Sequence, residues 1–293
     1  MAKIESQRAR WRRLGVAVME TLISLGKVAV PAYITLVALA YFYQDVLIFM
    51  PQARSERELQ AVLSRHRAVE EVRLPADDGV TLHGWFLGSG RAQGSRAPLL
   101  VYYGGNAEEV SWLLGEAGRF AGYSLLLVNY RGYGGSGGKP GESVLYADAL
   151  RIFDYAASRA DVDATRMVIM GRSLGSAMAV HVAARRAARA VVLVSPYDSM
   201  VALGRRHHPY LPVSMLLRHR FEALADAPRA NAPLLALVAS RDSIVPVEHS
   251  RRLVGAWGGP SAWRVIEGAD HNDISDSPAY WQAIAAFLAQ LRE

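Results

Sequence analysis

The sequence predicts an α/β domain with a mostly parallel central sheet and helices on both faces, preceded by a transmembrane helix. Through most of the 293 residues, short continuous apolar runs alternate with helical stretches, a pattern typical of parallel strands covered on both faces. One such run, residues 167–170, leads through a glycine-flanked turn directly into an Ala-rich helical stretch. Near the N-terminus lies a long apolar segment with a single charge. A chain of this length can hold one large domain plus such an appendage.

The first 44 residues divide into a basic segment, residues 1–20, and an apolar segment, residues 21–44. The apolar segment carries only Lys27 as a charge and has an aromatic cluster, residues 41–43, near its end. It is just long enough to cross a bilayer as a signal anchor, with Lys27 reaching one interface and the aromatic cluster lying in the other. Because the basic residues precede the span, we expect a cytoplasmic N-terminus and an extracytoplasmic domain.

Two other interpretations of this segment stay open. A cleaved signal peptide is compatible with the small-x-small pattern Ala38-Leu39-Ala40, although the region before the apolar run is unusually long for one. A helix lying on the membrane surface is compatible with the charges of Glu20 and Lys27. The anchor is favoured because residues 28–44 carry no charge.

Residues 45–293 are expected to form the α/β domain. A polar linker, residues 54–67, comes first, and the runs 69–74 and 80–87 then predict an antiparallel pair across the turn Asp77-Asp78-Gly79. Residues 198–233, with apolar side chains among basic ones, are expected to form a short cap. The other predicted strands are residues 99–103, 124–130, 167–170, 190–195, 234–239 and 263–266. Predicted helices begin at Ala107, Glu142, Leu174 and Val247, and a last helix spans residues 278–291.

Composition and motifs exclude several kinds of function. The chain has no cysteine, which excludes disulfides, thiolate catalysis and cysteine-ligated metal sites. Its net charge of +6 comes mostly from scattered arginines, so nucleic acid is not an expected partner. Residues 132–137 contain a literal Gly-x-Gly-x-x-Gly, but Lys139-Pro140-Gly141 delays the next helix, which argues against a dinucleotide site. His207-His208 has no partner at metal-ligand spacing. We therefore expect no cofactor and no metal.

The strongest functional signal is the strand, turn and helix around Gly171-Arg172-Ser173-Leu174-Gly175. Glycines on both sides remove Cβ atoms that would clash, and the turn presents the Ser173 hydroxyl at the carboxyl edge of the sheet. A serine hydroxyl needs a base, itself oriented by a carboxylate, to act as a nucleophile at neutral pH. Asp242 and His271 each follow a later predicted strand and so reach the same edge in the required order. Ser173, Asp242 and His271 are the candidate catalytic residues, and Asp198 is the alternative acid.

An oxyanion that develops during attack on a carbonyl needs two preorganised donors. One is expected to be the backbone N–H of Leu174, directly after the nucleophile. The other is assigned to the backbone N–H of Asn106, because Gly104-Gly105-Asn106 follows a predicted strand and lets the backbone turn toward the site.

With these residues in view, the chain resembles the α/β-hydrolase superfamily and, within it, the Bem46-like group of serine hydrolases, which also includes ABHD-type members. The resemblance extends from about Gln44 to the C-terminus. The motifs that carry it are Leu47-Ile48-Phe49-Met50-Pro51, Gly105-Asn106-Ala107, Asn129-Tyr130-Arg131-Gly132-Tyr133-Gly134-Gly135-Ser136, Gly171-Arg172-Ser173-Leu174-Gly175-Ser176 and His271-Asn272-Asp273.

The resemblance implies an α/β-hydrolase fold, with Ser173 as nucleophile, Asp242 as acid, His271 as base and the amides of Asn106 and Leu174 as oxyanion donors. Many members of the group also have an N-terminal membrane anchor. One departure is visible: where the family commonly has His-Gly-Asn, this chain has Gly104-Gly105-Asn106. The change removes an imidazole from the support of this loop and leaves the backbone donor in place.

These observations predict a membrane-anchored serine hydrolase that cleaves an acyl ester or thioester of a small molecule, a lipid or an acylated protein. Two alternatives remain. A serine peptidase that releases N-terminal residues would need acidic groups for a free α-amine, for which Glu108-Glu109 is the local candidate. A non-catalytic member would keep the fold and bind a lipid or a partner protein instead.

Overall fold

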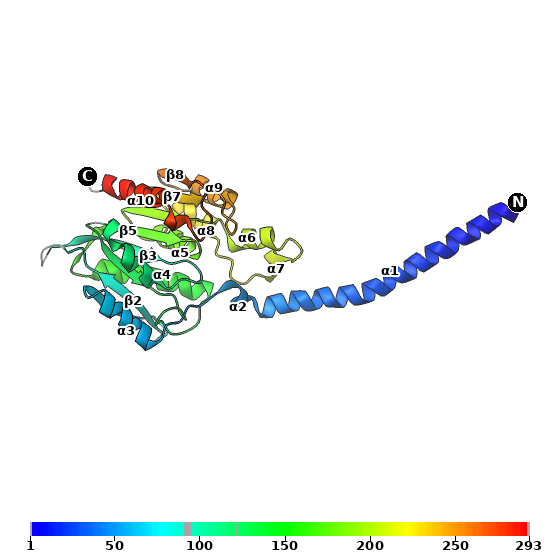
Figure 1. Cartoon of the computed structure of the whole chain (residues 1–293), viewed down its shortest axis with the longest axis horizontal. Coiled ribbons are helices and arrows are strands. Elements are labelled where there is room, and N and C mark those ends of the chain that lie inside the picture. Colours follow the sequence, from blue (N-terminus) through cyan, green and yellow to red (C-terminus); the bar gives the residue numbers. More distant parts are fainter. Residues whose placement is uncertain (1, 91–94, 121, 292–293) are drawn as a thin grey trace.

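The computed structural model describes residues 2–90, 95–120 and 122–291, and its core is one eight-stranded sheet (Figure 1). The strand order is β1-β2-β4-β3-β5-β6-β7-β8. Only β2 runs against its neighbours β1 and β4, so the prediction of a mostly parallel sheet that begins with an antiparallel pair is confirmed. The strands are β1 (Val69–Pro75), β2 (Thr81–Leu87), β3 (Ala97–Tyr103), β4 (Ser124–Val128), β5 (Val162–Arg172), β6 (Ala190–Val194), β7 (Leu234–Ala239) and β8 (Ser261–Ile266).

Helices cover both faces of the sheet, as the uninterrupted apolar character of the strands requires. Every residue of β3, β4, β6 and β7 is buried. One face packs against α4 (Glu142–Ser158), α5 (Leu174–Ala183) and α9 (Val247–Gly255). The other face packs against α3 (Glu56–Arg65), the 3-10 helix η1 (Val110–Phe120) and α10 (Pro278–Gln290). Helix α5 is apolar around most of its circumference because it lies between the sheet and other helices.

The N-terminal segment forms a single helix, α1 (Ala2–Phe42), which projects from the domain in Figure 1. No break separates the predicted basic segment from the predicted span. The part of the helix at Arg10–Phe42 is long and apolar enough to cross a membrane, and none of its most apolar window is buried against the domain. Pro31 lies inside the helix, a position that a membrane-spanning helix tolerates.

Two predicted elements differ in the structure. The prediction of a polar linker at residues 54–67 is wrong, because most of this stretch forms α3. Ser55 and Glu58 make a complete capping box at the start of this helix, and Leu59 is buried against the sheet. The helix expected from Ala107 begins only at Val110 and is a 3-10 helix. Ala107 has a positive φ of 54°, which an α-helix cannot accommodate.

Four short helices occupy the stretch predicted to be a cap. They leave the sheet after β6 and return to it at β7, and of these α6 and α7 lie on the side from which α1 projects in Figure 1. Their bounds are α6 (Met200–His207), α7 (Val213–Leu216), α8 (Ala223–Asp226) and the 3-10 helix η2 (Ala227–Arg229). A five-residue helix, α2 (Gln44–Ile48), connects α1 to the domain beside them.

Candidate active site

Ser173 stands at the turn between β5 and α5 with a strained backbone, φ 50° and ψ −115°. Its own N–H donates to the carbonyl of Val194, 2.8 Å away, and this bond ties the turn to β6. The flanking glycines are required by space. A Cβ on Gly171 would come within 2.4 Å of the Gly175 carbonyl, and one on Gly175 within 2.0 Å of the Tyr103 carbonyl. The strain persists because close packing on both sides leaves the turn no other path.

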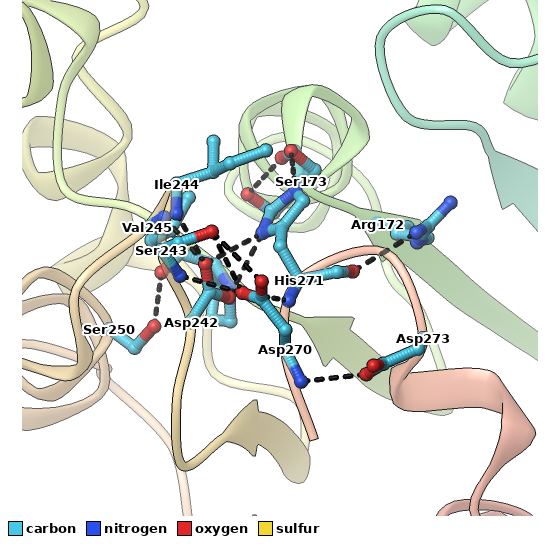
Figure 2. Close-up of polar contacts among 12 residues, drawn as sticks. Arg172, Ser173, Asp242, Ser243, Ile244, Val245, Ser250, Asp270, His271 and Asp273 are labelled. Carbon is cyan, nitrogen blue, oxygen red and sulfur yellow. Dashed lines mark hydrogen bonds and ion pairs between the residues drawn. The ribbon is translucent and has the colours of Figure 1, made fainter.

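The structure brings Ser173, His271 and Asp242 together, as Figure 2 shows. The Nε2 atom of His271 lies 2.9 Å from Ser173 Oγ. Its Nδ1 atom lies 2.9 Å from Asp242 Oδ2 and 3.0 Å from Oδ1. The three residues come from the loops after β5, β7 and β8, so strands that are far apart in sequence converge at one sheet edge.

The carboxyl group of Asp242 is held in its ionised form, which is the form that can orient an imidazole. Burial by itself would raise the pKa of its carboxyl, but hydrogen bonds from His271 and the backbone N–H of Val245 outweigh burial and hold the pKa below its ordinary value. The carboxylate therefore stays ionised at neutral pH. Asp198, the alternative acid, is placed elsewhere: its Oδ1 is 2.8 Å from Nδ1 of His249, and its Oδ2 accepts from Arg252.

The loop that carries His271 is anchored on two sides. Asp270 Oδ1 accepts hydrogen bonds from the N–H groups of Ser243 and His271, each at 2.7 Å, which joins the histidine loop to the loop of Asp242. On the other side Arg172 donates from Nη2 to the His271 carbonyl at 3.1 Å (Figure 2). The ring thus has little freedom to turn away from Ser173.

Asn106 lies beside Ser173, and its side chain fixes the loop after β3. Its Nδ2 donates to the carbonyl of Ile48 at 2.7 Å, and its Oδ1 accepts from the N–H of Met50 and the hydroxyl of Tyr133. Asn106, Ser173 and Leu174 line one cavity. The N–H of Leu174 is at the start of α5, where N–H groups have no acceptor within the helix. The two residues predicted to supply the oxyanion donors thus line the same cavity as Ser173.

Glu108 holds the loop after β3 in place. Its Oε2 accepts from the N–H of Gly105 at 2.7 Å and from Arg172 at 3.1 Å, while its Oε1 accepts from Tyr102 and Trp112, both at 2.6 Å. Through Glu108, Arg172 thereby connects the loop after β3, which carries Asn106, to the loop that carries His271. Burial would lower the pKa of the Arg172 guanidinium, but the carboxylate of Glu108 outweighs burial and raises it.

The sequence reasoning missed the supporting roles of Glu108 and Arg172. One signal was available in the motif itself, since the residue before the nucleophile lies at the same turn and can reach both neighbouring loops. Under the peptidase alternative, Glu108 and Glu109 are the candidates for binding a substrate amine. Both are buried and bound inside the protein, Glu109 to Asn129 and Ser111, and neither lines the cavity.

The cavity at Ser173 has a volume of about 740 Å³ and an apolar lining. It runs between the nucleophile, the cap helices α6 and α7, and the end of α1 and α2. None of the described residues that line it is Asp or Glu. His207-His208 lies in this lining, and His207 Nε2 is 2.8 Å from the carbonyl of Ile244. Among the residues with described positions, no group of three acidic or histidine side chains could hold a metal ion.

The Gly-x-Gly-x-x-Gly segment belongs to the scaffold. Gly134, with φ 52°, leaves no room for a Cβ because the Asn129 side chain would lie 2.2 Å from it. Arg131 forms a bidentate pair with buried Asp148, at 2.6 and 2.8 Å. The segment contacts β2, where the Gly137 N–H donates to the Thr81 carbonyl, and it does not open a helix, because α4 begins only at Glu142.

Comparison with known proteins places this geometry in a family. Residues 94–217 match the family model described as Hydrolase_4, serine aminopeptidase S33. The chain is 33% identical over 285 residues to an uncharacterized protein of Mycobacterium tuberculosis, covering 96% of each. It is 29% identical over 274 residues to the protein bem46 of Schizosaccharomyces pombe, covering 88% of this chain and 90% of that one. The solved acetyl xylan esterase from Paenibacillus sp. R4 superposes with a TM-score of 0.63 at 19% identity, over 85% of this chain and 98% of the esterase, and thus shares the fold.

The fold and the relatives agree with the resemblance that the motifs carry. The mostly parallel sheet has helices on both faces, and the nucleophile turn lies between β5 and α5. The match to the mycobacterial relative covers 96% of this chain and therefore includes the domain and most of the N-terminal helix. The chain belongs to the α/β-hydrolase family, as a relative of Bem46.

Proposed function

We propose that the protein is a membrane-anchored serine hydrolase that cleaves acyl esters or thioesters through an acyl-enzyme intermediate. The observation that carries the proposal is the pair of contacts of His271, whose Nε2 is 2.9 Å from Ser173 Oγ while Nδ1 faces Asp242. A base within hydrogen-bond reach of the nucleophile, itself held by a carboxylate, is the arrangement that activates serine.

The proposed reaction follows from these contacts. As Ser173 Oγ attacks the substrate carbonyl carbon, its proton passes to His271 Nε2, and Asp242 stabilises the imidazolium. The oxygen that gains negative charge accepts from the N–H groups of Asn106 and Leu174. His271 then gives the proton to the departing alcohol or thiol. Water next attacks the acyl carbon and passes a proton to His271, which returns it to Ser173 Oγ as the carboxylic acid leaves.

The cavity favours an acyl substrate over a peptide. Its lining is mostly aliphatic and aromatic, and its volume of about 740 Å³ lies within the range of about 300–1,000 Å³ typical of small-molecule sites. The peptidase alternative draws on the description of the matched family model. A free α-amine, however, would meet no described carboxylate in this lining, because Glu108 and Glu109 bind groups inside the protein. Parallel assays with an acyl p-nitrophenyl ester and an amino-acyl amide separate the two, and faster cleavage of the amide would favour the peptidase.

The anchoring part of the proposal depends on α1. Its apolar stretch has the length of a bilayer span, and its side chains from Arg10 onward are mostly exposed to the surroundings of the domain. We propose that this helix crosses the membrane with a cytoplasmic N-terminus, because the basic residues precede it.

A fluorophosphonate that reacts with activated serines tests the catalytic part. The folded full-length protein is expected to be labelled, and Ser173→Ala is expected to abolish the label. Ser64→Ala, on the exposed surface of α3, is the matched control and should be labelled like the wild type. Absence of labelling in the folded wild type would contradict the proposal and favour a non-catalytic binding protein.

A further inference from the structure

The last two turns of α1 form one side of the cavity at Ser173. Leu36, Leu39 and Ala40 line it, and so does Tyr43, the residue directly after the helix. The spacing of Leu36, Leu39 and Ala40 places them on one face of the helix, so a single apolar stripe of α1, continued by Tyr43, faces the cavity. The other walls come from α2 and from the cap helices α6 and α7.

Specific contacts hold this end of α1 against the cap. Gln44, which is buried, donates to the carbonyl of Leu216 at 3.2 Å and accepts from the N–H of Arg218 at 2.7 Å. Asp45 pairs with Arg218, and about three turns earlier in the chain the Tyr33 hydroxyl donates to the carbonyl of Tyr210 at 2.8 Å. These bonds lie at both ends of the cavity-lining stripe, so the stripe has a defined position relative to the cap.

The cavity opens beside the same stripe. Leu36 and Leu39 line the cavity and yet remain 46% and 51% exposed, which places the opening at their side chains. Both residues belong to the stretch of α1 that has the length and hydropathy of a bilayer span. On the cap, Tyr210 and Met215 are also exposed, at 59% and 84%. The opening is thus bordered by apolar side chains on both sides, as an opening toward lipid requires.

We propose that the C-terminal end of α1 is a wall of the acyl-chain site, through which the long acyl chain of a membrane-embedded ester or thioester passes from the bilayer to Ser173. This inference rests on the proposed hydrolase function and adds the substrate class. The cavity is continuous from the half-exposed leucines of α1 to Ser173 and its oxyanion donors. An acyl chain on this path stays in contact with apolar groups throughout, which makes its transfer from lipid to protein favourable. The helix is then part of the binding site as well as a tether.

Substitutions on opposite faces of α1 test the proposal in the full-length protein. In Leu39→Trp the larger side chain is expected to fill the opening of the cavity. Ala40→Phe places a large side chain in the same part of the cavity from the neighbouring position. Ile34→Trp is the matched control, because Ile34 is 60% exposed, does not line the cavity and lies on the opposite face of the same helix. Each variant is reconstituted into phosphatidylcholine vesicles and assayed with p-nitrophenyl butyrate and p-nitrophenyl palmitate. Alkyl fluorophosphonates with four and sixteen carbons give a second readout that needs no turnover.

We expect Leu39→Trp and Ala40→Phe to lower the ratio of long-chain to short-chain reaction by about tenfold, and Ile34→Trp to leave it at the wild-type value. If both cavity-side variants still cleave the butyrate and keep the wild-type ratio of long-chain to short-chain reaction, α1 is not a wall of the acyl-chain site. The proposed hydrolase function would stand in that case. If the folded wild type neither cleaves an ester nor reacts with a fluorophosphonate, the proposed function falls and this inference with it. A palmitoyl glycerol and an S-palmitoyl peptide, compared in the same vesicles, then identify which kind of molecule carries the chain.

Discussion

Each of the two aspartates considered as the catalytic acid contacts a histidine, and only one of these two histidines reaches Ser173. Asp242 faces His271, whereas Asp198 faces His249 and Arg252. We therefore expect Asp242→Asn to lower kcat by about 10³-fold or more, because the imidazole loses its orientation and the imidazolium its counter-charge. Asp198→Asn should keep kcat within about threefold of the wild type. Steady-state hydrolysis of a short acyl ester measures both, and the reverse pattern would make Asp198 the acid.

Asp198 is expected to affect stability in a pH-dependent way. Burial would raise the pKa of its carboxyl, but hydrogen bonds with His249 and Arg252 outweigh burial and lower it below the unfolded value of about 3.9. A lowered pKa stabilises the folded state above the unfolded pKa, and this contribution is lost as the pH falls through the folded pKa. The free energy of unfolding of Asp198→Asn should therefore be about 1–3 kcal/mol lower than that of the wild type at pH 7, and this difference should be smaller at pH 3. Urea unfolding at the two pH values measures it, and an equal difference at both would contradict the pairing.

Glu108 is expected to act on the reaction through the oxyanion loop. Glu108→Gln keeps the size of the side chain and removes the charge that holds Gly105 and Arg172. We expect kcat to fall by about 10- to 100-fold with a smaller change in KM, because the displaced donor acts mainly on the transition state. Glu116→Gln, which alters an exposed pair with Arg119, is the control. A larger rise in KM than fall in kcat would indicate that Glu108 serves substrate binding instead.

The sequence predicts the roles of some residues at the site and not of others. Ser173, Asp242 and His271 could be placed together because each lies in the turn or loop after a predicted strand, and parallel strands end at the same edge. Glu108 could not be assigned to the loop in this way, since its contacts with Tyr102, Trp112 and Arg172 depend on side-chain directions around a 3-10 helix. The positive φ of Ala107, which directs this stretch inward, has no signature in the residue type.

At the level of elements, the approach of α5 to β3 is set by glycine. The Cβ of Gly175→Ala would meet the carbonyl oxygens of Tyr103 and Gly104 at 2.0 and 2.5 Å, both backbone atoms that cannot move aside. We expect a loss of at least about 2 kcal/mol in the free energy of unfolding, together with lower activity from a displaced oxyanion loop. Gly255→Ala, where no atom lies within 4 Å, is the matched control. Thermal unfolding of both variants measures this, and equal stability would contradict the close approach.

Elements with strong apolar runs were predicted well, and elements with weak ones were not. Every core strand lies where a continuous apolar run predicted it, although β5 begins five residues earlier than expected. Helix α3 was missed because only Leu59 is fully buried on it, so charged residues dominate its composition. The capping box of Ser55 and Glu58 was the available signal for its start.

At the level of the whole molecule, the proposed role of α1 is to hold the domain at a membrane. If this helix crosses the bilayer, a carbonate wash of membranes should leave the full-length chain in the pellet, because the wash removes only peripherally bound proteins. Full-length protein in the soluble fraction would contradict the proposal that α1 is a membrane anchor. A shortened protein in that fraction would indicate that α1 is a cleaved signal peptide. The sequence could predict the length and polarity of this helix. It could not predict that the helix ends as a wall of the cavity, because that depends on how Gln44 and Tyr33 meet the cap.

The central claim, that Ser173 carries the acyl group between its two transfers, is tested most directly by mass spectrometry of the quenched enzyme. The full-length protein is mixed with p-nitrophenyl butyrate, quenched in acid within the first turnovers and digested. The account predicts one butyryl group on the peptide that contains Ser173, its disappearance as turnover ends, and no adduct in Ser173→Ala. Hydrolysis by Ser173→Ala at the wild-type rate, or wild-type hydrolysis with the adduct on another residue, would contradict it.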